Sequence, residues 1–307
     1  IENLLDYDDH YFEAAGDWVL GQRSALKVSA YYRIAHDAPG DTDRGGVVDR
    51  ARGVDTWHAP GIEANYRFGA KGARGRIEVG GDYSEKRYTN NEEFTKFSDV
   101  DQARLRGGFW WRIQPKTSGV FQINYSDFDY VNTPTTGDVP NTQDSNQIQY
   151  LVGLTWEALG KTTGRAMIGY NDKRFDSSLR ENGSDFSWLV GVEWRPQTYS
   201  KVTFETGQNY IESTGQGDAI DRKQIQAKWS HYWKTRFVTD LKLGYENRAY
   251  LGDPREDDRW KAGLGATYKM RRWLDIKAEY EFTDNDSNQP LEDYQRSVLW
   301  LSLDASL

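Results

Sequence analysis

The sequence predicts an all-β protein, a transmembrane antiparallel up-and-down β-barrel with about 15 strands in this chain. Three observations predict this fold. Apolar and polar residues alternate in one segment after another, short turns alternate with long loops, and aromatic residues mark the ends of the apolar faces. A period of two residues is typical of β-strands, and a strand that crosses a membrane turns one face to lipid and the other to the lumen.

Residues 145–158 and 163–176 give the clearest example of this pattern, as two strands joined by a short turn. The apolar face of the first strand carries Ile148, Tyr150, Val152, Leu154 and Trp156. The second strand continues with Ala166, Ile168 and Tyr170. Aromatic rings at both ends of an apolar face settle at the two lipid–water boundaries, so this hairpin is expected to span a membrane.

The composition agrees with a membrane barrel and excludes several other classes. Only 37% of the 307 residues are hydrophobic, which suits a barrel because only alternate strand residues meet lipid. No run of 18 apolar residues occurs, so a transmembrane helix is excluded. The absence of cysteine is compatible with an oxidising periplasm. A net charge of −8 argues against nucleic acid as a partner.

The other strands follow along the chain without a domain boundary, so residues 1–307 are expected to form a single outer-membrane barrel domain. Residues 37–53, 90–101 and 133–144 are expected to be long polar loops. The predicted strands are 10–20, 25–35, 61–69, 76–88, 102–113, 119–131, 185–195, 201–211, 222–233, 236–248, 258–270, 273–283 and 295–307.

Two aromatic belts distinguish this chain from a soluble β-sandwich or propeller. Tryptophans close strands just before short turns: Trp18, Trp111, Trp156, Trp194 and Trp233. Tyrosines lie late in strands that leave short turns: Tyr32, Tyr83, Tyr125, Tyr170, Tyr210, Tyr245 and Tyr280. A soluble fold has no reason to sort Trp and Tyr by strand direction, whereas a membrane barrel places both in girdles. The turns are also basic, with Arg23, Lys71, Arg74, Lys116, Lys161, Lys234, Arg271 and Arg272.

The strand count predicts that the complete barrel is larger. A single-chain bacterial barrel closes with an even number of antiparallel strands, and this chain provides an odd number. We therefore expect one or three strands before Ile1, which gives 16 or 18 in the complete protein. A barrel of that size encloses an aqueous channel.

Charged residues of both signs fall on the inner face. The predicted pore-lining residues are Lys27, Arg33, Arg67, Glu78, Arg104, Arg106, Arg112, Lys173, Glu193, Lys228, Lys242, Glu246, Lys277 and Glu279. One interpretation is a hydrated wall whose charges pair across strands. The other is a conduit in which Arg104, Arg106 and Arg112 form a positive ladder for anionic sugars. Inner Tyr31 and Trp110 could stack on sugar rings or brace the wall.

The sequence contains no motif of an enzyme, a metal site or a cofactor site. His10, His36, His58 and His231 lie in separate hairpins, and no nucleophile motif accompanies them. His231 falls on the lipid-facing register, where a general base has no use. No catalytic residue, metal ligand or cofactor is therefore predicted.

Four stretches carry a resemblance to a known family: 4–33, 66–88, 150–170 and 257–303, among them YRFGAKGARGRIEVGGDYSEKRY and YLVGLTWEALGKTTGRAMIGY. They resemble the putative beta-barrel porin 2 family, which includes outer-membrane barrels encoded with exopolysaccharide and exosortase systems. Family members are about three strands longer at the N-terminus, which favours 18 strands.

The resemblance implies a role in moving exopolysaccharide or capsular polysaccharide across the bacterial outer membrane, together with a periplasmic polysaccharide-export protein. Two alternatives stay open: a general diffusion porin for small solutes, and a structural barrel that anchors a surface assembly through its loops. The remaining expected partners are outer-membrane lipid and lipopolysaccharide.

Overall fold

A computed structural model describes residues 7–37, 53–70, 72–136, 139–159, 161–213, 215, 217–290 and 292–306. Fifteen antiparallel strands form one sheet in which every strand pairs with its neighbours along the chain. They are β1 (His10–Val19), β2 (Ser24–Asp37), β3 (Asp55–Phe68), β4 (Gly75–Tyr88), β5 (Val100–Gln114), β6 (Thr117–Tyr130), β9 (Ser145–Leu159), β10 (Thr162–Phe175), β11 (Gly183–Gln197), β12 (Ser200–Glu212), β13 (Ala219–Lys234), β14 (Phe237–Tyr250), β15 (Glu256–Arg271), β16 (Leu274–Ser287) and β17 (Tyr294–Ala305).

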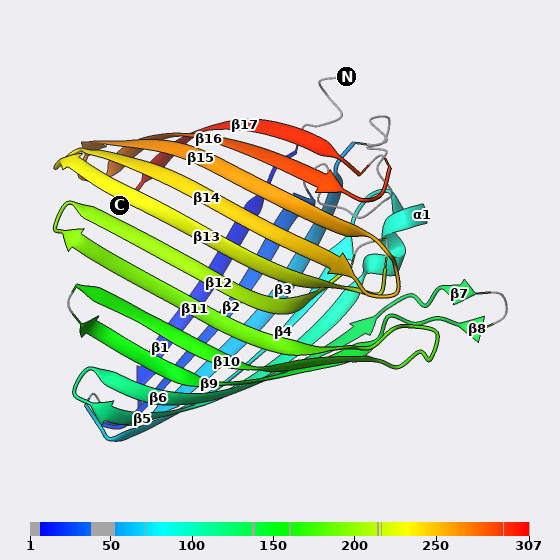
Figure 1. The fold of residues 1–307 in the computed structure, drawn as a ribbon, viewed down its shortest axis with the longest axis horizontal. Helices are drawn as coiled ribbons and strands as arrows, with labels where there is room; N and C mark the ends of the chain where they lie inside the picture. The colour runs from blue at the N-terminus through cyan, green and yellow to red at the C-terminus, as the bar shows by residue number, and fades with distance from the viewer. Residues whose placement is uncertain are drawn as a thin grey trace.

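The sheet curves round on itself, so that β1–β4 cross behind β9–β17, while β5 and β6 run along the lower edge beside β9 (Figure 1). The all-β, up-and-down barrel topology predicted from the alternation is confirmed. Within the described residues β1 and β17 form the two edges of the sheet, and each pairs on one side only. Both run from the loop end to the turn end, so a direct pairing between them would be parallel. The expectation of 16 or 18 strands stays a prediction.

The convex face of the sheet is an exposed apolar band. Leu154, Ile168 and Leu243 are 46%, 56% and 54% exposed, and all three lie on the face predicted to meet lipid. The register aligns apolar residues from strand to strand in rows around the barrel, such as Trp229, Leu241, Leu264, Tyr280 and Leu299. A continuous exposed apolar band of this kind requires hydrocarbon as its solvent.

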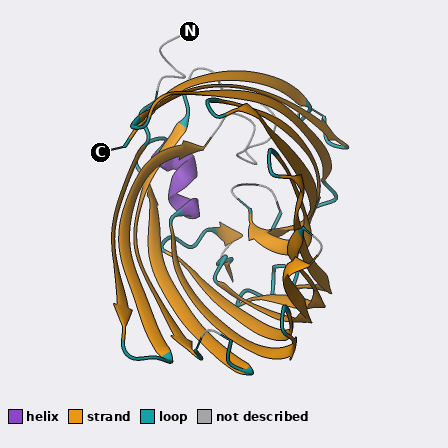
Figure 2. Cartoon of the chain, turned by 90° about the vertical axis from the view of Figure 1, so that its left-hand side faces the viewer, coloured by secondary structure: helices purple, strands orange, loops and turns teal. Residues whose placement is uncertain are grey.

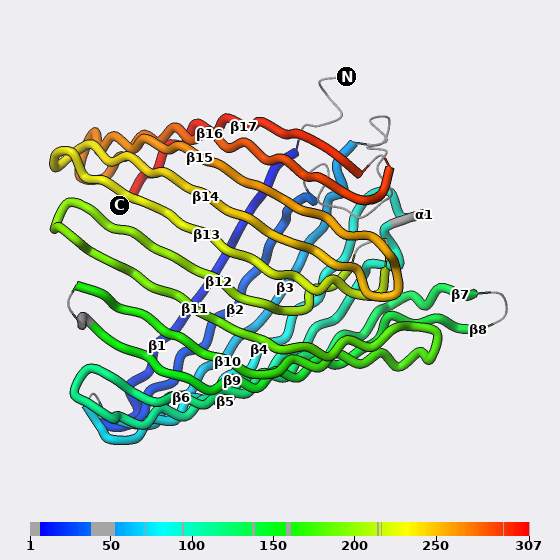
Figure 3. The backbone as a smooth tube through the Cα atoms, in the orientation of Figure 1, coloured from blue at the N-terminus to red at the C-terminus, as the bar shows by residue number. Residues whose placement is uncertain are grey.

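The loops depart from the prediction in two places. The predicted loop 90–101 contains α1 (Glu92–Thr95) and the 3-10 helix η2 (Lys96–Ser98), and the predicted loop 133–144 contains the hairpin β7 (Thr135–Thr136) and β8 (Val139–Pro140). Helix α1 lies at the loop end and falls inside the ring of strands in the view of Figure 2, while the β7–β8 hairpin projects beyond the loop ends of the wall strands (Figure 3). Short local structure of this kind leaves no periodic signal in the sequence.

Some strand boundaries are also wrong, because β3 begins at Asp55 and not at residue 61, and β16 ends at Ser287 and not at residue 283. In this early part of β3, Tyr32 faces Pro60. The sequence shows no apolar run here, so the predicted strand begins later. Most of the predicted loop 37–53 and the basic residue Lys71 lie outside the described residues. In the part of the chain that is described, no helix has the length and apolar character to cross a bilayer.

Two glycines allow the sheet to bend tightly between β9 and β10. A Cβ atom at Gly169 would lie 1.6 Å from the carbonyl oxygen of Tyr150, and one at Gly153 would lie 2.0 Å from that of Ala166. Neither position has room for a side chain. Inner-face residues Val120, Leu151 and Met167 fill the concave side of this bend and are 4% exposed or less, with Trp110 and Leu189 packed against them.

Candidate transport pathway

The register places every predicted pore-lining residue on the inner face of the sheet. Glu63, Asp82 and Arg104 show the rule, since they face one another across β3, β4 and β5. Their neighbours in sequence, Tyr83 and Leu105, point outward and are exposed. The full inner set comprises Lys27, Arg33, Arg67, Glu78, Arg104, Arg106, Arg112, Lys173, Glu193, Lys228, Lys242, Glu246, Lys277 and Glu279.

The three arginines of β5 do not form an unbalanced positive ladder. Arg104 Nε lies 2.7 Å from Asp82, and Arg106 Nη2 lies 2.7 Å from Glu63 and 3.2 Å from the second oxygen of Asp82. Two carboxylates therefore neutralise two of the three guanidinium groups. The predicted ladder is wrong because the curvature of the wall brings Glu63, which lies on β3, within reach of Arg106 on β5, two strands away.

The opposite wall is balanced in the same way. Lys242 and Lys277 both reach Glu279, at 2.8 and 2.6 Å, and Lys228 lies 3.1 Å from Asp240. Further inner-face ion pairs join Glu78 to Arg76, Glu193 to Arg195 and Glu246 to Arg248. Most of the wall thus follows the interpretation of a hydrated surface with paired charges.

Several inner cations stand apart from this pairing, and three of them lie at the turn end. Among the described residues, no carboxylate lies within ion-pair distance of Lys27, Arg67 or Arg112, all of which are exposed. Each lies in the turn-end part of its strand. Arg112 reaches the β3–β4 turn, since a Cβ atom at Gly72 would lie 3.5 Å from its Nη1. The turn end of the inner face also carries carboxylates, with Asp17 opposite Lys27 and Asp275 opposite Asp304, so charges of both signs meet there.

The two inner rings considered for sugar stacking already have cationic partners. The guanidinium of Arg33 lies 5.0 Å from the ring centre of Tyr31, and that of Arg76 lies 4.5 Å from the ring centre of Trp110. These are cation–π contacts that brace the wall. Another inner ring, that of Trp300, is 40% exposed and faces Glu279 across β16 and β17.

The loop end of β12 leaves the sheet and folds inward. Pairing with β11 stops at Leu189 and Gly207, whereas pairing with β13 continues to Glu212 and Ala219. Beyond Gly207 the hairpin leans over the inner face of β11. The hydroxyl of Ser187 on β11 donates to the carbonyl oxygen of Gln208, 3.0 Å away, and the ring of Tyr210 packs over Gly183.

The inward lean makes a second layer, which we call the loop-end layer and define as Gln208–Glu212 with Ala219–Asp221. The residues beneath it on the wall are fully covered: Asn171, Lys173 and Ser187 are each 0% exposed. Tyr210 is 5% exposed and so is not a lipid-facing girdle residue, contrary to its predicted role. Its position in the strand alternation is outward, but the strand has left the barrel wall at that point.

Glu212 joins this layer to the wall at two points. Its carboxylate accepts a hydrogen bond from Lys173 on β10 and another, of 2.8 Å, from the hydroxyl of Tyr130 on β6. Lys173 also donates to Ser145 at 3.0 Å and lies 4.2 Å from the ring centre of Phe128. The sequence does not single out Glu212 or Tyr130, because alternation alone places Glu212 on the outward side.

The long loops are tied to one another at the same end of the barrel. Arg180, which follows β10, binds Asp218, which precedes β13, at 2.8 Å, and it also donates to the carbonyl oxygen of Thr142 at 2.7 Å. Arg255 binds Asp257 at 2.7 Å and Glu292 at 3.1 Å. Burial alone would lower the pKa of Arg255, but its hydrogen bond to Asp257 and the nearby negative charges outweigh burial and raise it. This guanidinium therefore stays charged.

The remaining aromatic girdle residues lie on the outer face. Trp18, Trp111, Trp194, Trp233, Tyr32, Tyr83, Tyr125, Tyr170 and Tyr280 are exposed, and Trp156 and Tyr245 are half-buried. His231 lies on the outer register, between the rings of Trp229, Trp233 and Tyr199. Among the described residues, no three His, Asp or Glu side chains gather into a metal-binding group.

Comparisons with known proteins give a family and a fold. The FrpB iron transporter of Neisseria meningitidis (F5-1 variant, apoprotein form) is similar over 91% of this chain and 52% of its own, with a TM-score of 0.58 and 10% identity. A mutant of the ferric enterobactin receptor PfeA of Pseudomonas aeruginosa matches 96% of this chain and 61% of its own (TM-score 0.52, 8% identity). The siderophore receptor PiuA of Acinetobacter baumannii matches 95% of this chain and 57% of its own, with a TM-score of 0.51 and 10% identity.

This chain spans a little over half the length of these structures. At such low identity the likeness shows the fold alone, and that fold is an outer-membrane β-barrel. No curated protein sequence matches the chain. The sequence profile of the putative beta-barrel porin 2 family matches residues 4–307. The chain therefore belongs to the putative beta-barrel porin 2 family.

Proposed function

We propose that this outer-membrane barrel is a gated conduit for the export of an acidic exopolysaccharide or capsular polysaccharide. The observation that carries the proposal is the loop-end layer, which covers the inner wall at the outer end and is fastened by Glu212 to Lys173 and Tyr130. A general diffusion porin works with a permanently open lumen. A conduit for a polymer that is secreted only on demand needs an outer end that stays covered until the polymer arrives.

The inner wall supports a hydrophilic, acidic cargo. Its paired charges keep it hydrated without binding an ion of either sign strongly, which suits the passage of a long polar chain. Lys27, Arg67 and Arg112 at the turn-end mouth have no carboxylate within ion-pair distance among the described residues, so their charges are open to an acidic polymer. Charge of one sign at the mouth of a channel raises the local concentration of an oppositely charged substrate. A polymer that contains uronate groups fits this entrance.

The expected partners follow from the orientation of the barrel. Outer-membrane barrels keep short turns in the periplasm and long loops outside. A periplasmic polysaccharide-export protein would therefore meet the turn end, beside Lys27, Arg67 and Arg112. Lipopolysaccharide would surround the loop end. This role involves no covalent chemistry, in keeping with the channels and receptors that share the fold.

Measurements can distinguish two alternative functions from polysaccharide export. A general diffusion porin predicts steady ion conductance of the purified barrel, without a partner. A structural barrel that anchors a surface assembly predicts loops bound to another chain and no loss of polymer from the cell surface when the lumen charges are changed. The iron transporters and receptors share only the fold with this chain, so iron uptake is not proposed.

A deletion strain tests the proposal directly. Loss of the gene should remove polysaccharide from the cell surface and leave it in the periplasm, and the wild-type gene should restore it. A K27Q/R67Q/R112Q variant should restore it poorly, and the charge-balanced variant D82N/R104Q should restore it well. Unchanged surface polysaccharide in the deletion strain would refute the export role.

A further inference from the structure

We propose that the outer face of β13–β17 binds an anionic phospholipid of the periplasmic leaflet, with one acyl chain in a groove and the headgroup at the turn-end rim. This site lies on the lipid side of the wall, and it does not depend on the identity of the cargo.

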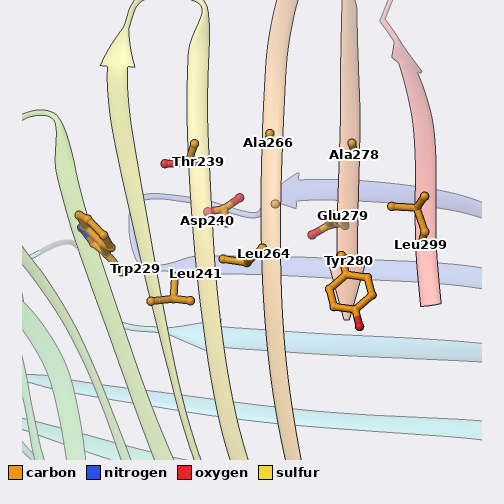
Figure 4. Close-up of a pocket in the computed structure, with 11 residues that line it drawn as sticks. Trp229, Thr239, Asp240, Leu241, Leu264, Ala266, Ala278, Glu279, Tyr280 and Leu299 are labelled. Carbon is orange, nitrogen blue, oxygen red and sulfur yellow. The ribbon is translucent and has the colours of Figure 1, made fainter. Parts of the chain in front are cut away.

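The groove has a volume of about 460 Å³. Ala266 on β15 and Ala278 on β16 are the small outer-face residues that line it, with Trp229, Leu241 and Leu299 around them (Figure 4). Asp240, Gly265 and Glu279, which pair in an inner-face row, also contribute to the lining. Neighbouring rows of the outer face carry large side chains, such as Leu243 and Phe282. The hollow therefore arises because two adjacent strands place alanine on the outer face at the same level.

The register places this groove on the lipid-facing side of the wall, where an apolar chain would fill it. Thr239, Ala266 and Ala278 face one another across β14, β15 and β16, all on the face that meets hydrocarbon. Water gains no hydrogen bonds from alanine and leucine side chains, and a hollow without any occupant loses their dispersion contacts. A flexible acyl chain restores those contacts at this depth.

A cationic group lies at the turn-end side of the same strands. We call it the rim cluster and define it as Lys234, Arg236, Arg271 and Arg272, all exposed. Arg236 precedes Thr239 by three residues and Arg271 follows Ala266 by five, so the cluster lies roughly 10 and 17 Å from the groove along the strands. This separation matches the depth of an acyl chain that starts from a headgroup at the rim.

The charge of the rim cluster selects the headgroup. The carboxylates nearest to these turns, Asp275 and Asp304, alternate onto the inner face. The outer face of these described strands thus carries no carboxylate at the level of the rim cluster. Basic residues at a membrane surface favour anionic over zwitterionic lipid. Trp233, which lies beside the rim cluster and is 59% exposed, marks the interface at this level.

Native mass spectrometry of the purified barrel, with phosphatidylglycerol or phosphatidylcholine added, tests the site. The wild-type barrel should retain phosphatidylglycerol in preference to phosphatidylcholine. An R236Q/R271Q variant should lose that preference, with retention of phosphatidylglycerol reduced about tenfold. An A278F variant, which fills the groove, should retain neither lipid.

The matched control is R23Q/R74Q, which removes two exposed cations from the turns on the opposite wall. It should retain phosphatidylglycerol like the wild type. Equal retention by R236Q/R271Q and the wild type would overturn the proposal, as would an equal loss in both double variants. If the barrel forms dimers that A278F abolishes while lipid retention stays the same, the groove binds a second copy and the proposal is wrong. Heat-resistant migration of each variant in gels confirms that it is folded.

Discussion

Lys173 on β10 donates a hydrogen bond to Glu212 on β12, although β11 lies between these two strands in the sheet. The contact exists because β12 leaves β11 after Gly207 and crosses to the inner side. The Lys173 side chain is completely enclosed, and Tyr130 on β6 donates to the same carboxylate. One acidic side chain therefore connects the loop-end layer with two separate parts of the wall.

Glu212→Gln should open the loop end. Removing one partner of a buried ion pair costs about 3–5 kcal/mol, because the other charge is left without compensation. The layer should then leave the wall more often, and planar bilayer recordings should show larger or more frequent conductance steps than the wild type.

The control for this variant is Glu279→Gln, which breaks another inner-face pair, with Lys242, outside the loop-end layer. It should change ion selectivity but not the frequency of opening. If Glu212→Gln behaves like the control, the layer does not act as a gate.

Lys27, Arg67 and Arg112 should contribute to ion selectivity. The K27Q/R67Q/R112Q variant should shift the reversal potential in a salt gradient towards cation selectivity, because three unpaired positive charges are lost at the entrance. The D82N/R104Q variant removes one charge of each sign and should leave the reversal potential near that of the wild type. Equal shifts in both variants would contradict a special role for the mouth.

The sequence was sufficient for the parts of the structure that depend on alternation. Strand positions, the inner or outer direction of side chains and the turn-end tryptophans follow from a period of two, which every wall strand obeys. Leu154 and Arg104 face the expected sides for this reason.

Alternation could not reveal contacts that depend on curvature. The pairing of Arg106 with Glu63 needs a concave wall, and the burial of Tyr210 needs a strand that leaves the sheet. The small helices and the β7–β8 hairpin are too short to give a periodic signal. These features decide the charge of the lumen and the covering of its outer end, and so they carry most of the functional argument.

Lipid exposure of the convex face predicts a strong asymmetry between neighbouring residues. Leu243→Lys places a charge in hydrocarbon and should destabilise the barrel by about 2–4 kcal/mol. Glu281→Lys, on the inner face, should cost less than about 1 kcal/mol because water fills that side. Urea unfolding in lipid vesicles measures both values, and similar costs would contradict the assignment of the two faces.

The tight bend between β9 and β10 should tolerate no side chain at Gly169. A Cβ atom there would overlap the carbonyl oxygen of Tyr150 at 1.6 Å, which no rotamer change relieves because both groups belong to the backbone. Overpacking of this kind costs at least about 1–3 kcal/mol, and the strands must separate to accept it. Gly169→Ala should therefore lower the yield of heat-resistant, folded barrel in a gel assay.

Gly244→Ala is the matched control, because the nearest atoms to its Cβ lie 3.7 and 3.9 Å away, and it should fold like the wild type. Normal folding of Gly169→Ala would show that the bend does not depend on glycine.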